Sequence, residues 1–188
     1  MRERIKRGKP AGFKSIAGSL LLAHPALSDQ NFRHTVVLMS AHNDEGAMGI
    51  VLNRPLGRRL GELNGEFSLG PLASVPVFRG GPVQTEQLVL AAWQAQGDGC
   101  KLHFGLEPEK AAQLAAEEGV HLRAFLGYSG WSGGQLEKEL KQDTWVVTAA
   151  PGDLMSRPQD DSLWRIVLGG ISLNWRLLAD EPEDTGLN

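Results

Sequence analysis

Short apolar runs, separated by glycine, proline and polar turns, recur along the whole chain. Runs of four to eight β-branched or apolar residues bounded by turn residues are typical of buried strands. The turn at Asn43 to Gly46 joins two such runs into a hairpin. The pattern predicts strands over residues 19–23, 35–40, 47–53, 75–79, 87–93, 101–104, 122–127 and 145–149.

Helical patterns are fewer and shorter. Pro108 at a first helical position predicts a helix over residues 109–118, which ends at Gly119. Shorter helices are expected over residues 59–63, 135–141, 152–156 and 160–168, and Gly169-Gly170 is expected to stop the last of them. Because long helices seldom separate the strands, we expect an α+β fold with a mainly antiparallel sheet that closes into a barrel-like shape.

Composition points to one globular domain. The chain has 188 residues, 41% hydrophobic content and a net charge of −3. Residues 15–178 are expected to form the domain, between a basic arm (1–14) and an acidic tail (179–188). Cys100 is the only cysteine, which excludes an intramolecular disulfide and suits a reducing compartment. No run approaches the length of a membrane helix, and the apolar run at residues 18–23 is too short for a signal peptide, so we expect a cytoplasmic protein without membrane contact.

A glycine-rich stretch at residues 123–136 carries the strongest local signal. Within it, Gly130-Trp131-Ser132-Gly133-Gly134 matches the G-x-S-x-G pattern of a serine nucleophile on a strand-to-helix turn. Such a serine needs a base, and in that fold the histidine follows it. All five histidines of this chain precede Ser132. The hydrolase interpretation is therefore the weakest of those considered.

Two other interpretations of this stretch stay open. Backbone N–H groups at Gly133 and Gly134, before a helix, can bind an anion. Alternatively, the glycines only permit the turn, Trp131 packs in the core and Ser132 caps the helix. The second interpretation is the simpler one.

Arg54 is the other candidate. It follows a buried strand and stands between Asn53 and Pro55, where its guanidinium could bind a carboxylate or phosphate ligand. The alternative is a structural ion pair, or a bond to carbonyl groups at a strand end. The histidines lack metal-ligand spacing and no phosphate-binding glycine loop is present, so we expect no metal and no cofactor.

Several segments together resemble one family. They are Leu20 to Leu27 with Asp29 and Phe32, Val36-Val37-Leu38 with His42, Gly46-Ala47, Gly49 to Val51 with Asn53-Arg54-Pro55, Gly80-Gly81-Pro82-Val83, Gly127 to Trp131, Gly134 to Glu137, and Trp145. In this order they resemble the YqgE/AlgH family of bacterial proteins over residues 20–164. The resemblance implies a cytosolic α+β protein with a barrel-like, bifurcated sheet surrounded by helices.

The family has no agreed activity or catalytic residues, and its members are often called transcriptional regulators. The resemblance draws attention to the polar and glycine positions, which we expect to converge on one concave surface. That surface would bind a small anionic ligand or a protein partner. The candidate ligand-binding residues are Asn53, Arg54, Gly80, Gly81, Tyr128, Ser129, Trp131, Ser132, Gly133, Gly134 and Gln135.

Three functions follow from these observations. The first is a non-enzymatic binding or regulatory protein, and the second is a transcriptional regulator that acts on DNA directly or through a partner. DNA binding itself gains no support from the sequence, because only the arm is basic and no helix–turn–helix pattern is present. The third is a hydrolase that uses Ser132.

Overall fold

The computed structural model describes residues 14–96 and 99–180 of the chain. The strands in chain order are β1 (Ser19–Ala23), β2 (Val36–Asn43), β3 (Gly46–Val51), β4 (Pro55–Arg59), β5 (Pro76–Arg79), β6 (Val83–Gln96), β7 (Gly99–Phe104), β8 (Val120–Ser132) and β9 (Trp145–Ala149). The helices are α1 (Leu60–Leu63), α2 (Pro108–Ala115), α3 (Gln135–Lys141), α4 (Asp161–Ile171) and α5 (Leu173–Asp180), with short 3₁₀ turns η1 (Gly65–Phe67) and η2 (Leu154–Ser156).

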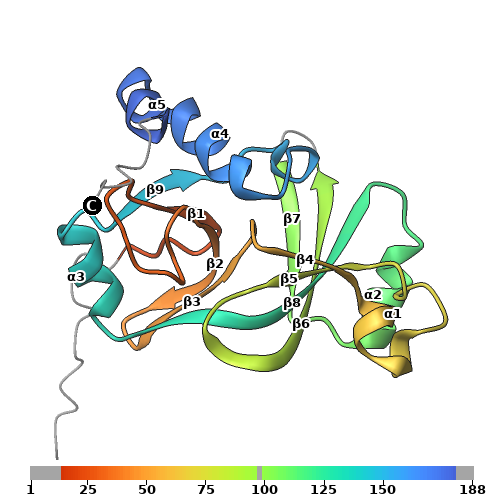
Figure 1. The fold of residues 1–188 in the computed structure, drawn as a ribbon. Helices are drawn as coiled ribbons and strands as arrows, with labels where there is room; N and C mark the ends of the chain where they lie inside the picture. The colour runs from red at the N-terminus through yellow and green to blue at the C-terminus, as the bar shows by residue number, and fades with distance from the viewer. Residues whose placement is uncertain (1–13, 97–98, 181–188) are drawn as a thin grey trace, which may run out of the picture.

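Two groups of strands share the long strand β8 (Figure 1). The first half of β8 pairs with β5 and β6, while its last residues pair with β3. Beyond β3, the strands β2, β1 and β9 continue the sheet, and beyond β6 lies β7. All of these pairs are antiparallel except β5 with β8, which is parallel. The mixed α+β class and the mainly antiparallel sheet are therefore confirmed.

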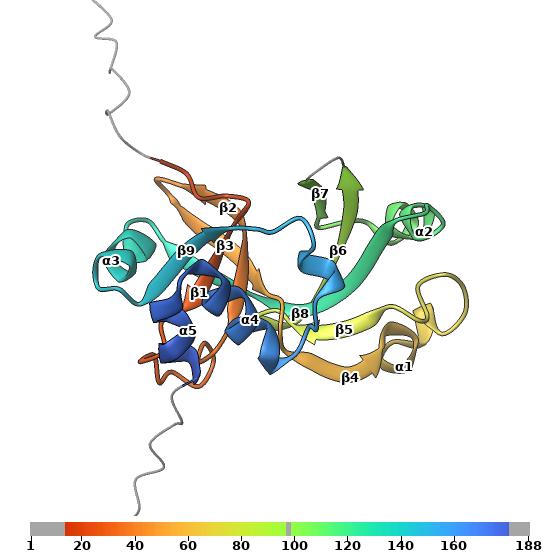
Figure 2. The ribbon, with the colours of Figure 1, turned by 90° about the horizontal axis from the view of Figure 1, so that it is seen from above.

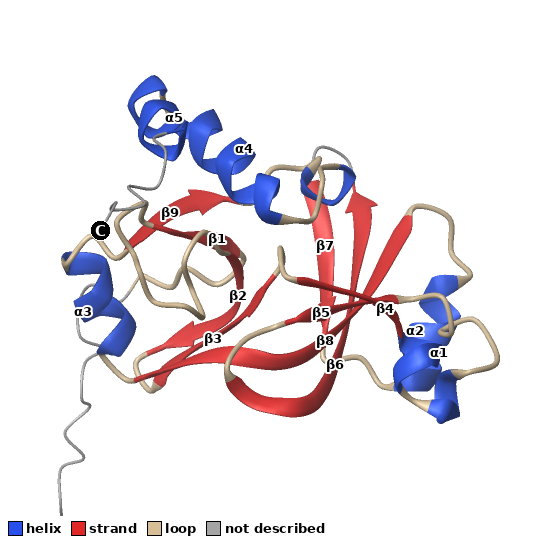
Figure 3. Ribbon diagram, in the orientation of Figure 1, coloured by secondary structure: helices blue, strands red, loops and turns tan. Residues whose placement is uncertain are grey.

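The barrel-like closure is not confirmed. The strand path begins at β4 and ends at β9, and neither strand pairs with the other to close the sheet. The sheet instead branches at β8, as seen from above in Figure 2. The helices lie around this open sheet: α1 and α2 at one end, α3 at the other, and α4 with α5 over one face (Figure 3).

The apolar runs of β1 and of the first half of β2 form strands that are buried on both faces. In β1, Leu20 and Leu22 belong to the core beneath α4, whereas Leu21 belongs to the core beneath α3. A third core, around Leu90 and Ala124, lies beneath α1 and α2. Burial of both faces explains why these strands appear in the sequence as continuous apolar runs rather than as alternating patterns.

The glycine-rich stretch at residues 123–136 was predicted to turn soon after a strand that ends at Gly127, and the structure differs from this prediction. β8 does not end at Gly127 but continues to Ser132, and the chain turns only at Gly133-Gly134, where Gly134 has a φ of +78°. The strand continues because residues 129–132 find a new partner in β3. Composition alone could not reveal that partner.

The C-terminal helices also differ from their predictions. Gly169-Gly170 does not stop a helix: α4 runs through both glycines to Ile171, and α5 follows it. The apolar face of α4, which includes Trp164 and Leu168, is buried on the core, and this burial outweighs the cost of about 1 kcal/mol for each glycine in a helix. Ala179 is buried in α5, although the tail was expected to begin there.

The helix expected at residues 109–118 is shorter, since α2 ends at Ala115. The predicted basic arm, apart from Lys14, and residues 181–188 of the predicted tail lie outside the described residues. Within the described part of the chain, no helix is long and apolar enough to cross a membrane.

Candidate functional site

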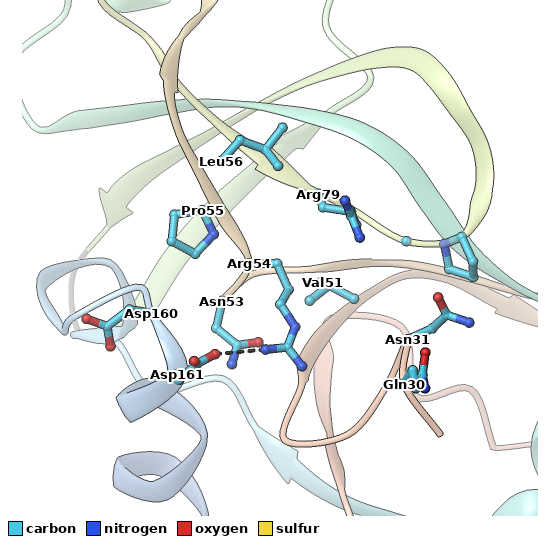
Figure 4. Close-up of a pocket in the computed structure, with 12 residues that line it drawn as sticks. Gln30, Asn31, Val51, Asn53, Arg54, Pro55, Leu56, Arg79, Asp160 and Asp161 are labelled. Atoms are coloured by element: carbon cyan, nitrogen blue, oxygen red, sulfur yellow. Dashed lines mark hydrogen bonds and ion pairs between the residues drawn. The ribbon is translucent and has the colours of Figure 1, made fainter. Parts of the chain in front are cut away.

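A pocket of about 350 Å³ lies where the two groups of strands diverge, next to the start of α4 (Figure 4). Three segments supply most of it: the loop before β2, the chain from the end of β3 into β4, and the chain after β5. Its lining residues are Gln30, Asn31, Val51, Asn53, Arg54, Pro55, Leu56, Arg79, Gly81, Pro82, Asp160 and Asp161.

Asn53 is a structural residue of this pocket. Its side chain is fully buried; Oδ1 accepts from the Val36 N–H at 2.9 Å and Nδ2 donates to the His34 carbonyl oxygen at 2.9 Å. The amide therefore fastens the end of β3 to the start of β2. This fixes the direction in which the chain leaves the sheet, and with it the position of Arg54.

Arg54 makes the ion pair that the structural alternative predicted, and it also contacts a backbone carbonyl, which belongs to a turn and not to a strand end. Its Nη1 lies 2.8 Å from Asp161 Oδ1, and its Nη2 donates to the Arg33 carbonyl oxygen at 2.5 Å. The Asp161 carboxylate is 80% exposed, so solvent screens this ion pair. The Arg54 guanidinium is nevertheless engaged by two partners within the fold, one carboxylate and one backbone carbonyl.

Arg79 is the cation that sequence analysis overlooked. Its backbone N–H donates to the Arg54 carbonyl oxygen at 2.8 Å, so the two arginines lie on neighbouring segments of the chain. Unlike Arg54, its side chain has no hydrogen bond or ion pair to another described residue, and it lines the pocket. A usable signal was present in the sequence, because Arg79 ends a strand directly before Gly80-Gly81-Pro82, much as Arg54 precedes Pro55.

The pocket has two ends of different character. Arg79 lies toward the end that holds Gln30 and Asn31, while Asp160 and Asp161 lie at the other (Figure 4). Asp160 caps α4: its carboxylate accepts from the Ser162 hydroxyl and N–H, and these hydrogen bonds lower its pKa. A carboxylate held in this way is ionised near neutral pH and is already engaged.

Gly80 and Gly81 allow the segment after β5 to cross close to the backbone of β8. A Cβ on Gly80 would lie 2.2 Å from the Gly127 carbonyl oxygen, and one on Gly81 would lie 2.2 Å from the Tyr128 carbonyl oxygen. Any side chain at either position would therefore meet backbone. These glycines, with Gly127, form the crossing at which β8 passes from one group of strands to the other.

Tyr128, Ser129 and Trp131 do not line the pocket. Ser129 is fully buried and its Oγ donates to the Gly80 carbonyl oxygen at 3.3 Å, so it supports the crossing. Tyr128 lines a different hollow, beside β6. The indole of Trp131 packs in the core beneath α3 and donates to Glu139 Oε2 at 2.9 Å.

The turn from Ser132 to Gln135 lies apart from the pocket, before α3. Ser132 is five residues beyond Gly127 along an extended strand, roughly 16 Å at 3.3 Å per residue. Gln135 Oε1 accepts from the Ser132 N–H at 3.1 Å, and the Ser132 hydroxyl donates to the same oxygen at 3.3 Å. Gly134, not Ser132, has the positive φ, so the serine is not on the strained turn of a nucleophile.

The expected single surface is thus divided. The pocket brings together Asn53, Arg54 and Gly81, adds Arg79, and leaves out Gly80 and residues 128–135. Among the residues that the structure describes, no group of three His, Cys, Asp or Glu side chains could hold a metal ion.

The fold and the site define an α+β protein with a branched sheet and an arginine-containing pocket at the branch. A family model described as AlgH-like matches residues 20–176. The chain belongs to this family, which the sequence motifs resembled.

Relatives and solved structures agree with this assignment. A UPF0301 protein from Streptomyces coelicolor is 38% identical over 188 residues, covering 93% of this chain and 96% of the relative. A UPF0301 protein from Mycobacterium avium is 35% identical, covering 95% and 94%. The solution structure of the AlgH protein from Pseudomonas aeruginosa matches with a TM-score of 0.66 and 26% identity, covering 95% of this chain and 98% of that one. A crystal structure from Corynebacterium diphtheriae, 21% identical with a TM-score of 0.67, covers 93% and 94% and shares the fold.

Proposed function

We propose that this protein is a non-enzymatic binding protein, and that its pocket takes a small anionic ligand at Arg79. The observation that carries the proposal is the Arg79 guanidinium, which lines a concave site and has no partner among the described residues. Guanidinium N–H groups match the geometry of carboxylate and phosphate oxygens. The side-chain amides of Gln30 and Asn31 line the same end of the pocket and can donate further hydrogen bonds.

Arg54 has a supporting role in this proposal. Its contacts with Asp161 and Arg33 hold the wall between the pocket and a neighbouring hollow, which is lined by Arg33, His34, Arg54, Asp161, Ser162 and Arg165. Arg79 is therefore the residue that would bind the negatively charged group of the ligand. A cavity of about 350 Å³ suits a small metabolite, because ligand pockets generally span about 300–1,000 Å³.

A binding role fits the pocket better than catalysis does. Asp160 caps a helix and its pKa is lowered, away from the near-neutral value that suits a general base, while Asp161 is held in an ion pair with Arg54. A ligand-responsive regulator is compatible with this proposal. Direct DNA binding gains little support, because the exposed side of α5 carries Leu173 and Leu177, and Arg176 is its only cation.

A thermal-shift comparison tests the proposal. Inorganic phosphate, pyrophosphate, ATP, citrate and FMN are tested against the wild type, Arg79→Ala and Arg58→Ala. Arg58 is the matched control, because it is exposed on β4 and lines none of the pockets described above. A ligand at ten times its Kd stabilises the folded state by about 1.4 kcal/mol, which raises Tm by about 3–6 °C at this chain length.

The expected result is a ligand-dependent shift in the wild type and in Arg58→Ala that is lost in Arg79→Ala. Equal shifts in all three proteins would place the ligand elsewhere, and the absence of any shift would remove the support for a small-anion site. Arg54→Ala is a poorer test, because it also removes two contacts that hold the fold.

A further inference from the structure

The hollow beside β6, which holds Tyr128, is a second concave site. Its volume is about 450 Å³, and it lies between β6, the middle of β3 at Met48, and the segment that leads from β7 to α2. The lining residues are Met48, Gln84, Gln87, Leu88, Val89, Leu90, Phe104, Gly105, Leu106, Glu107, Pro108 and Tyr128. It shares no residue with the arginine pocket.

Along this hollow, one edge of β6 is unpaired. β7 pairs with β6 only from Ala91 onward, so the preceding residues have no strand on that side within the described chain. The register with β8 is also interrupted between Val83 and Leu88, where the bulge places Gln84 at a positive φ of +46°. Such bulges often occur beside binding sites.

The hydrogen-bond pattern shows which backbone groups face the hollow. Leu88 lies opposite Leu126, whose carbonyl oxygen accepts from the Gly80 N–H on the far side of β8. Leu88 and Leu126 are therefore a non-hydrogen-bonded pair, so the N–H and C=O of Leu88 point away from β8. Leu90, two residues on, confirms this direction, because its carbonyl oxygen accepts from the Leu106 N–H on the same side.

Three backbone groups are left without a partner among the described residues: the Leu88 N–H, the Leu88 C=O and the Leu90 N–H. The hollow at their side has an apolar part, with Met48 and Phe104, and a polar uncharged part. The Tyr128 hydroxyl and the amides of Gln84 and Gln87 supply the latter and have no hydrogen bond to another described residue.

We propose that a short extended peptide binds here by adding a strand to the Leu88–Leu90 edge of β6. Main-chain hydrogen bonds supply affinity in this mode, and pockets for alternate side chains supply specificity. The only charged side chain in the lining is Glu107, so the site favours an uncharged or basic peptide. The ligand class thus differs from that of the arginine pocket, and neither proposal depends on the other.

The test uses the blocked peptide acetyl-Thr-Val-Lys-Val-Thr-amide, titrated into ¹⁵N-labelled full-length protein and followed by NMR. Alternate N–H groups of an extended peptide face the same side. Two matched control peptides are therefore N-methylated, one at residues 2 and 4 and the other at residues 1, 3 and 5. The expected result is a perturbation of the Leu88 and Leu90 amides by the parent peptide and by one of the two methylated peptides. The other should bind at least tenfold more weakly.

Two protein variants complete the test. Glu107→Gln should weaken binding of the lysine peptide about two- to fivefold, and this variant is structurally mild because Glu107 makes no side-chain cap bond to α2. Leu88→Pro removes one edge donor, and in this variant the Leu90 amide is the reporter: it should no longer be perturbed by the peptide in a protein that still folds. Perturbation by both methylated peptides equally, or none at Leu88 and Leu90 at millimolar parent peptide, would overturn the proposal.

Discussion

Glu139 gives the sharpest stability prediction. One carboxylate oxygen, Oε2, accepts from both the Trp131 indole N–H at 2.9 Å and the Trp145 indole N–H at 2.8 Å. The other oxygen, Oε1, accepts from Gln135 Nε2 at 3.0 Å. Both indoles are about 95% buried, and the Phe32 ring packs against each of them. A single side chain on α3 thus satisfies two buried donors on two different strands.

The expected cost of Glu139→Ala follows from these contacts. Each buried N–H that loses its acceptor costs about 1–3 kcal/mol. Two such groups give a loss of about 2–6 kcal/mol in the free energy of unfolding, a large share of the stability of an ordinary domain. Glu139→Gln keeps one acceptor oxygen for the two indoles, but it removes the charge assistance and replaces the oxygen that accepts from Gln135 with an amide NH₂, so its cost should be about 1–2 kcal/mol.

Urea denaturation followed by tryptophan fluorescence measures these differences. The matched control is Lys138→Ala, an exposed neighbour on the same helix, which should change stability by less than about 0.5 kcal/mol. If Glu139→Ala cost no more than Lys138→Ala, the two indole bonds would not stabilise the fold as described.

The remaining predictions concern backbone crossing, acid stability and a buried cation. In thermal denaturation, Gly81→Ala should lower the free energy of unfolding by several kcal/mol and Gly57→Ala by only about 1 kcal/mol. Both glycines have a positive φ, but only at position 81 would a Cβ meet backbone atoms. Equal losses in the two variants would contradict this explanation. The pKa of Glu137 is lowered, first by a hydrogen bond from its own backbone N–H and then by His42, whose Nε2 is 2.9 Å from Glu137 Oε1. This stabilisation is present above the ordinary pKa of 4.5 and is lost as the pH falls. Glu137→Gln should therefore reduce the loss of stability at acid pH more than the control Glu45→Gln does. Burial lowers the pKa of Arg123 to about 10, which is an unfavourable contribution of about 3 kcal/mol to stability. Cation–π contacts with Phe78 and Trp93 and a hydrogen bond to Gln159 offset this contribution. Arg123→Met should therefore change stability by no more than about 1 kcal/mol, and a loss above about 3 kcal/mol would show that these contacts outweigh desolvation.

Much of the fold could be predicted from local pattern. The strand at residues 19–23 has the predicted bounds, and the hairpin around Asn43–Gly46 forms as expected. The sequence could not show that β8 changes partners in mid-strand, because residues 129–132 pair with a segment 80 to 86 positions earlier. Nor could it show that α4 continues through Gly169-Gly170, since this depends on burial against strands far away in the chain.

The lining of the candidate site was predictable only in part. Asn53, Arg54 and Gly81 stood out as polar or glycine positions beside strands, and they do line one pocket. Arg79 was overlooked, because its proximity to Arg54 depends on the pairing of β4 with β5. Conversely, the Ser132–Gln135 turn has an attractive composition, but its polar groups bond to each other at a separate place.

The most direct test of anion binding at Arg79 is an NMR titration that follows the side chain of this residue. In ¹⁵N-labelled protein, the arginine Nε–H resonances are followed during addition of inorganic pyrophosphate, with Arg58 as the internal control. Anion binding at Arg79 predicts a saturable shift of the Arg79 resonance and of the Gly81 amide resonance, with little change at Arg58. Equal, non-saturating shifts at both arginines, or a saturable response that leaves Arg79 unmoved, would contradict it.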